Sequence, residues 1–170
     1  MRKQKGFSLI ELLIVVAIIL IIAAIAIPNL LRSRMAANES SAASTIRTLN
    51  TAQVAYSTTY ANVGYAASLL DLSPNGIDCT DPTKVDSTHA CQIDSVLGCG
   101  ANVACKKGAY QYNMTAGTPG ADYLAFGYPI STSGGNKRYC SQPDAVVKFD
   151  SLTVTTAPDL TACKAMAAIQ

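Results

Sequence analysis

Apolar residues fill the chain from Leu9 to Ile27 almost without interruption. A single carboxylate, Glu11, stands inside the run, and Pro28 follows it directly. About twenty apolar residues in one helix are enough to cross the hydrocarbon core of a bilayer. At roughly 1.5 Å per residue, residues 7–31 extend for about 37 Å. The stretch is therefore predicted to be a membrane-spanning helix.

Beyond Pro28 the sequence continues to favour helix, but the pattern becomes amphipathic. A proline inside a helix removes one backbone donor and usually kinks the axis. We therefore expect one long helix over about 7–60, bent near Pro28. Residues spaced by three, four or seven form a single stripe on its second half: Met35, Ala42, Ile46, Leu49, Gln53, Tyr56 and Tyr60. The first half is apolar on all sides and requires lipid or other chains as its partner.

Alternation of apolar and polar residues begins near residue 109 and predicts strands. Two strands are expected over 109–114 and 123–130, and others over 137–141 and 145–150, joined by turns rich in glycine. They would form an antiparallel meander of three or four strands, with one apolar face packed on the helical stripe. The predicted class is α+β. Short helices are expected over 66–72 and 159–170, and a loop region over 77–107.

The formal net charge of +2 is concentrated at the N-terminus, where Arg2, Lys3 and Lys5 supply three of the thirteen basic residues. Without residues 1–6 the chain carries ten bases and eleven acids. No overall basicity remains to indicate specific nucleic-acid binding. Basic residues before an apolar span favour a cytoplasmic N-terminus, with the rest of the chain across the membrane.

All six cysteines lie between residues 79 and 163, outside the apolar run. An even number in an exported domain indicates disulfides. A zinc site is the alternative, but the closest spacings are wide for one and His89 is the only histidine. Six cysteines allow 15 pairings, which the spacing alone leaves open. No calcium loop, cofactor motif or catalytic constellation is visible, so we expect neither a metal, a cofactor nor an enzyme.

Glu11 is the anomaly of the apolar run. An ionised carboxylate near the centre of a membrane helix costs about 2.5–3.5 kcal/mol on insertion scales, and a cationic partner lessens the penalty. Glu11 is therefore predicted to have a functional role with a positively charged partner. The alternative is an acid tolerated near the membrane interface, snorkelling or protonated.

The segment GFSLIELLIVVAI, residues 6–18 after a short basic leader, closely resembles the class III leader of type IV prepilins. The resemblance implies cleavage between Gly6 and Phe7 by a membrane prepilin peptidase, followed by N-methylation of Phe7. A leader of this length and a mature N-terminal phenylalanine are similar to the IVa subclass. It further implies that Glu11 pairs with the terminal amine of a neighbouring subunit, which would set the axial register between identical chains.

The resemblance also implies a pilin fold, with a leader over 1–6, a filament-core helix over 7–31, its amphipathic half over 32–60 and a globular domain over 61–170. A Cys140–Cys163 bridge would resemble the C-terminal disulfide loop of the family. Cys79–Cys91 and Cys99–Cys105 would be local staples. Some relatives have a glycine before the matching proline, whereas this chain has none, so melting of that segment in a filament stays open.

A structural subunit is the function that the resemblance implies. It would wait in the inner membrane with a cytoplasmic N-terminus and then polymerise into an extracellular fibre for adhesion, motility or DNA uptake. Its partners would be identical subunits, the peptidase and N-methyltransferase, and an assembly machinery with separate ATPases, because the chain has no phosphate-binding loop. The alternatives are a pseudopilin of a type II secretion system, a minor pilin and, in another class, an enzyme anchored by an uncleaved helix.

Overall fold

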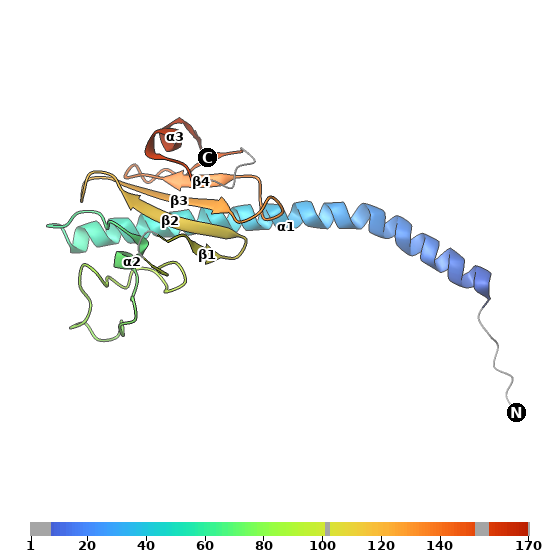
Figure 1. Ribbon diagram of the computed structural model, residues 1–170, viewed down its shortest axis with the longest axis horizontal. Coiled ribbons are helices and arrows are strands. Elements are labelled where there is room, and N and C mark those ends of the chain that lie inside the picture. Colours follow the sequence, from blue (N-terminus) through green and yellow to red (C-terminus); the bar gives the residue numbers. More distant parts are fainter. Residues whose placement is uncertain (1–7, 101–102, 152–156, 170) are drawn as a thin grey trace, which may run out of the picture. The chain divides into compact units, whose positions relative to one another are not determined.

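The computed structural model describes residues 8–100, 103–151 and 157–169. The chain forms two compact units, residues 1–34 and 35–170. Both contain part of α1, and the other elements belong to the second unit (Figure 1). In order these are α1 (Leu9–Thr59), α2 (Leu69–Leu72), β1 (Cys105–Lys107), β2 (Tyr110–Ala116), β3 (Tyr123–Pro129), β4 (Arg138–Ser141), β5 (Lys148–Asp150), α3 (Leu160–Ala165) and β6 (Ala167–Ala168).

The first unit is the apolar part of α1. Its first backbone hydrogen bond within the described residues runs from the N–H of Leu12 to the carbonyl of Ser8, at 3.2 Å. Pro28 lies inside α1, and the helix continues beyond it. The long helix expected from the sequence is confirmed and ends one residue before the predicted position, at Thr59. The kink expected at Pro28 stays a prediction.

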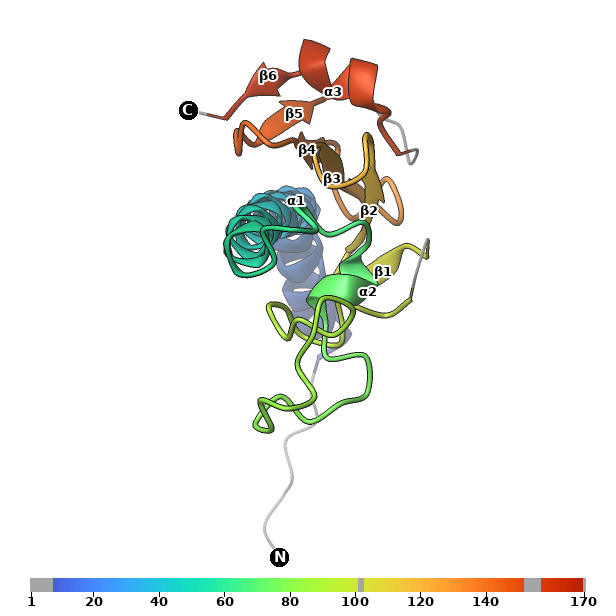
Figure 2. The same ribbon diagram turned by 90° about the vertical axis from the view of Figure 1, so that its left-hand side faces the viewer.

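In the second unit, α1 packs against a six-stranded antiparallel sheet whose strands follow the order of the chain, β1-β2-β3-β4-β5-β6. Figure 2 shows the sheet curving around one side of α1, with α3 on the opposite face of the sheet. The expected α+β fold, a long helix on an antiparallel sheet, is confirmed. The part of α1 from Met35 onward belongs to the same compact unit as the sheet.

The predicted helical stripe forms the centre of the main core. Ala42, Ile46, Leu49 and Gln53 have no exposed surface, and Tyr56 is 2% exposed. Tyr60 packs against the core at its edge. The sheet contributes residues from alternate positions, as the period of a strand requires: Tyr110, Tyr112, Met114, Tyr123, Ala125 and Tyr139. Gly127 of β3 makes room for this packing, because a Cβ there would lie 2.7 Å from the ring of Tyr112.

Strand β3 is buried on both faces. Its residues Leu124 and Phe126 point away from α1 and form a second, small core with Cys140 and Cys163, which Leu160 of α3 covers. The apolar face expected over 123–130 is therefore the face under α3. The face toward α1 instead carries Tyr123, Ala125 and the small Gly127.

The sequence predicted three or four strands, and the structure has six. Strands β2 to β5 correspond to the expected ones. The additional strands lie at the two edges, β1 beside β2 and β6 beside β5. Both are short, and both lack the alternation of apolar and polar residues that marks a half-buried strand. β6 also replaces the end of the helix expected over 159–170, since α3 stops at Ala165.

Candidate functional site

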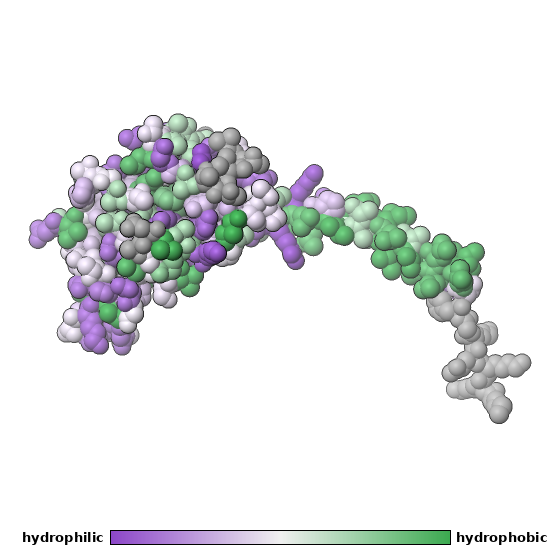
Figure 3. All heavy atoms as spheres, in the orientation of Figure 1, coloured by the Kyte–Doolittle hydropathy of each residue, from purple (hydrophilic) through white to green (hydrophobic). Residues whose placement is uncertain are grey.

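The first unit presents an apolar surface on every side. No residue of α1 between Leu9 and Leu31 is buried, and the large apolar side chains there are between 46% and 79% exposed. Figure 3 shows this stretch as a nearly continuous hydrophobic surface, in green. Isolated apolar residues on a surface are ordinary, but a contiguous apolar surface of this extent indicates contact with lipid or with other chains.

By length and composition alone, α1 is the one helix among the described residues that is able to cross a membrane. The same criteria are met by signal sequences near an N-terminus, so the helix by itself is weak evidence for a span. Glu11 is the only charged residue between Leu9 and Leu31.

Glu11 is held by its own helix. Its Oε2 accepts a hydrogen bond of 2.9 Å from the backbone N–H of Ser8, three residues earlier. This is the half of a capping box in which an acidic side chain at the third helical position reaches back to the N-cap N–H. A carboxylate offers about four lone-pair directions. One bond to Ser8 therefore leaves Glu11 able to accept from a further donor, such as an ammonium group.

The predicted cleavage and methylation positions, Gly6 and Phe7, lie outside the described residues. The positive end of the helix dipole favours Glu11 in the first turn of α1.

Comparison with known proteins identifies this N-terminal stretch. A protein-family profile, the prokaryotic N-terminal methylation motif, matches residues 1–27. A type IV wide pilus major component, PilA4 of Thermus thermophilus, is 67% identical over 39 residues, which are 23% of this chain and 30% of that protein. A type IV major pilin protein, PilA of Myxococcus xanthus, is 48% identical over 54 residues, 32% of this chain and 24% of that protein. No solved structure matches the chain.

The start of the chain is similar to that of type IV pilins with a class III leader. The segment matched by the methylation motif, residues 1–27, includes Glu11 in the first turn of α1 and the apolar run up to Ile27. The chain covers less than a third of the length of these two relatives. The likeness therefore concerns only part of the chain, and the family motif within it lies at the N-terminus.

The six cysteines are joined in the three pairs considered from the sequence. Cys140 of β4 is bonded to Cys163 of α3, with the Cα atoms 5.9 Å apart. This bond ties α3 to the outer face of the sheet. Cys79–Cys91 and Cys99–Cys105 close short segments of the loop region between α2 and β2, with Cα distances of 5.9 and 5.5 Å. That region carries little regular structure, and covalent links compensate for a small core.

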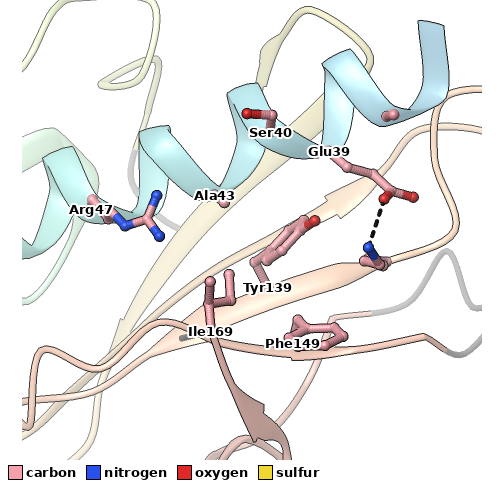
Figure 4. A pocket seen from close by; sticks show the side chains of 9 residues that line it. Glu39, Ser40, Ala43, Arg47, Tyr139, Phe149 and Ile169 are labelled. Atoms are coloured by element: carbon pink, nitrogen blue, oxygen red, sulfur yellow. Dashed lines mark ion pairs between the residues drawn. The ribbon is translucent and has the colours of Figure 1, made fainter. Parts of the chain in front are cut away.

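The second unit contains a cavity of about 360 Å³ between α1 and the β4–β5 side of the sheet. Figure 4 shows Ser40 and Ala43 on its helical wall and Tyr139, Phe149 and Ile169 opposite them. Small side chains at helical spacing leave this space open. Glu39 and Lys137 close one end through an ion pair of 3.1 Å, and the Lys137 ammonium lies 5.5 Å from the centre of the Phe149 ring.

Glu39 also fixes the turn between β3 and β4. Its Oε1 accepts from the backbone N–H of Asn136 at 2.9 Å, and the neighbouring Asn38 donates to the carbonyl of Gly134 at 3.0 Å. Burial raises the pKa of Tyr139 above its ordinary value. Its phenol is therefore neutral at physiological pH, and it is a packing residue of this wall.

These contacts were not predicted. The sequence gives no signal that Glu39 meets the 134–137 turn, because the two segments are almost a hundred residues apart. Gln53 was assigned to the apolar stripe, but its amide bonds both the N–H and the carbonyl of Ala66, at 2.9 and 3.0 Å. A polar residue within an apolar stripe was the available signal, because a buried amide requires partners.

Possible metal ligands were also compared across the described ranges. Within 8–100, 103–151 and 157–169 no three His, Cys, Asp or Glu side chains form a group able to hold a metal ion. The two curated relatives are structural pilus proteins by name. The feature that distinguishes the first unit is the apolar helix with Glu11 in its first turn.

Proposed function

We propose that this protein is a structural subunit of a type IV pilus and polymerises through residues 7–31 into an extracellular fibre. The observation that carries the proposal is an apolar helical segment exposed on all sides with one carboxylate in its first turn, in a chain part of which is similar to major pilus proteins of two bacteria. In a fibre, the helices of identical subunits replace the lipid around each other. Adhesion, surface motility and DNA uptake are the functions we consider for it.

Before assembly, the subunit would stand in the inner membrane with a cytoplasmic N-terminus, as the basic residues before the span favour. A prepilin peptidase would cut between Gly6 and Phe7 and an N-methyltransferase activity would modify Phe7. These steps are supported by the methylation motif over residues 1–27. The cut matters physically because it creates an ammonium group four residues before Glu11.

Glu11 would then pair with the terminal amine of the next subunit. An unpaired carboxylate is strongly disfavoured among apolar helices, whereas a paired one is tolerated. Only one axial offset between neighbouring helices brings the two charges together. The main effect of the pair would therefore be to fix the axial register between subunits. Its contribution to the strength of the contact would be smaller.

A pseudopilin of a type II secretion system is the main alternative, because it would share the leader and the helix. Three disulfides in the second unit favour an exposed fibre, in which covalent links resist unfolding. A minor pilin is the second alternative. An enzyme anchored by an uncleaved helix would retain residues 1–6, which mass spectrometry of the purified protein detects.

The test is to shear filaments from cells that make this protein, image them, and identify their subunit by mass spectrometry. We expect a chain that begins at methylated Phe7 and forms most of the filament mass. Glu11→Ala should leave membrane insertion and cleavage intact and abolish the filaments. Normal filaments from Glu11→Ala would contradict the register role, and absence of the chain from surface filaments would favour the pseudopilin.

A further inference from the structure

We propose that Arg32 and Arg34 form a cationic collar that binds the phosphates of anionic phospholipids where α1 leaves the outer leaflet of the inner membrane. The collar rests on the proposed function, because it requires the precursor to span the membrane. The collar acts in the precursor before assembly, and the lipid phosphates are its ligand at the outer end of the membrane span.

The position of the collar follows from the length of the apolar run. Arg32 directly follows Leu31, which ends the segment 9–31, where Glu11 is the one charged residue. At about 1.5 Å per residue, this segment extends for roughly 34 Å, close to the thickness of a bilayer's hydrocarbon core. The guanidinium groups would therefore reach the headgroup layer, and their aliphatic stems would pack along the boundary.

Both arginines are exposed, and within the described part of the chain neither makes an ion pair or a side-chain hydrogen bond. The next acid along the chain, Glu39, is already engaged by Lys137 and by the Asn136 N–H. The chain thus leaves two permanent positive charges directly beside its apolar span without an anion of its own.

The spacing of the two arginines favours lipid over a single protein carboxylate. Residues two apart on a helix point about 200° from each other, so Arg32 and Arg34 project from nearly opposite sides. One acidic side chain cannot contact both, whereas lipid headgroups surround the helix. Figure 3 shows hydrophilic side chains, in purple, projecting to both sides of the helix where the green stretch ends. The guanidinium group also matches phosphate oxygens with two parallel hydrogen bonds.

The collar bears on the cleavage step as well. Basic residues on the outer side oppose the positive-inside bias, and the leader supplies the three basic residues that outweigh them. Cleavage after Gly6 removes those three and leaves the collar in place. The leader charges that favour a cytoplasmic N-terminus are then gone, whereas Arg32 and Arg34 remain bound to the lipid headgroups at the outer surface. Assembly must withdraw the subunit from this surface.

The experiment uses the full-length precursor in nanodiscs of phosphatidylcholine, alone or mixed with phosphatidylglycerol. Backbone hydrogen exchange is measured over residues 12–27 and 29–36. We expect the 29–36 amides to exchange more slowly when phosphatidylglycerol is present, by up to about 30-fold, the limit that the attraction of two arginines to an anionic surface sets. The double variant R32Q/R34Q should lose this difference. Arg47→Gln, an exposed arginine further along the same helix, is the matched control and should retain it.

Each outcome has a distinct meaning. Equal exchange of 29–36 in both lipids, or an equal loss of the difference in the Arg47→Gln control, overturns the collar. If the collar is overturned in this way but the amides of 12–27 exchange slowly in both lipids, the proposal of a membrane-anchored precursor still holds. Fast exchange of 12–27 in both lipids would contradict the anchored precursor and the collar together.

Discussion

The backbone N–H of Ser8 lies 2.9 Å from Oε2 of Glu11 and donates a hydrogen bond to it. The carboxylate therefore caps the N-terminus of its own helix in the single chain. Two roles meet in one side chain, since the oxygen acceptor caps the helix and the negative charge is available to an amine. Substitutions that keep one property and remove the other separate the two roles.

Glu11→Gln keeps an oxygen acceptor for Ser8 and removes the charge. We expect its helix start to remain protected, because the cap needs only an acceptor, while filaments are lost because the amine of the neighbour has no charged partner. Glu11→Leu should lose both. Backbone hydrogen exchange at residues 8–12 in detergent reports the cap, and imaging of sheared filaments reports assembly. Filaments from Glu11→Gln at the normal level would mean that the charge is dispensable.

Gln53 joins α1 to the segment after it. Its side chain has no exposed surface, and it bonds both backbone groups of Ala66. Gln53→Leu keeps an apolar volume but leaves a buried N–H and carbonyl without partners. Unfolding in denaturant should show a loss of about 2–4 kcal/mol. Thr51→Ala, on the exposed side of α1, is the control and should change stability by no more than about 0.5 kcal/mol. Equal stability of the two variants would mean that the amide contributes only as packing volume.

Gly64 and Gly120 bring two loops into direct contact. Gly64 has a φ of +81°, and a Cβ on it would overlap the carbonyl of Gly120. Gly76 has a similar φ of +85° but open space around it. Gly76→Ala should therefore cost about 1 kcal/mol through backbone strain alone, and Gly64→Ala clearly more, because the loops must also separate. Thermal unfolding of the two variants measures the difference. A smaller effect at Gly64 than at Gly76 would refute the steric argument.

Asp86 makes the 75–91 loop sensitive to acid. Its Oδ1 accepts from the hydroxyl and the backbone N–H of Thr88, each at 2.8 Å. These bonds, with a smaller effect of His89, lower the pKa of the carboxyl from 3.8 to about 2. A pKa lowered by folding contributes stability above the unfolded pKa, and this contribution is lost as the pH falls from about 4 to about 2. Thr88→Val removes the hydroxyl donor and should raise the pKa of Asp86.

Titration of the Asp86 carboxyl by NMR tests this expectation. Thr83→Val is the control, since the Thr83 hydroxyl bonds Asp81 and not Asp86, and it should leave the pKa of Asp86 unchanged. An Asp86 that titrates near 3.8 in the unsubstituted protein would show that the turn is not formed in solution.

Much of this fold could be predicted because its strongest signals are local. The apolar run, the stripe from Ala42 to Tyr56 and the alternation in β2 each lie within a short stretch of sequence. The edge strands β1 and β6 could not be predicted, because they are held by backbone pairing and not by the burial of alternate side chains. The burial of the β3 face that carries Phe126 could not be predicted for another reason, because the position of α3 decides that this face is buried.

Part of the candidate site could likewise be predicted from the sequence. A carboxylate among apolar residues marks Glu11 from sequence alone, because its cost requires a role. No residue pattern in the sequence indicates the cavity beside Glu39. It depends on small residues of α1 meeting Tyr139 and Phe149 across a large separation in sequence, and small residues at helical spacing are common in any packed helix.

The strand order of the sheet has a consequence for biogenesis. Since each strand pairs with the one before it in sequence, no strand has to wait for a distant partner, and loop closure between successive strands is short. Contacts that are local in sequence form quickly. If the second unit is exported across the membrane as proposed, α1 would be available first, and the strands would be able to add onto it one after another. The pairing of β6 on β5 would then be the last to form in this sheet.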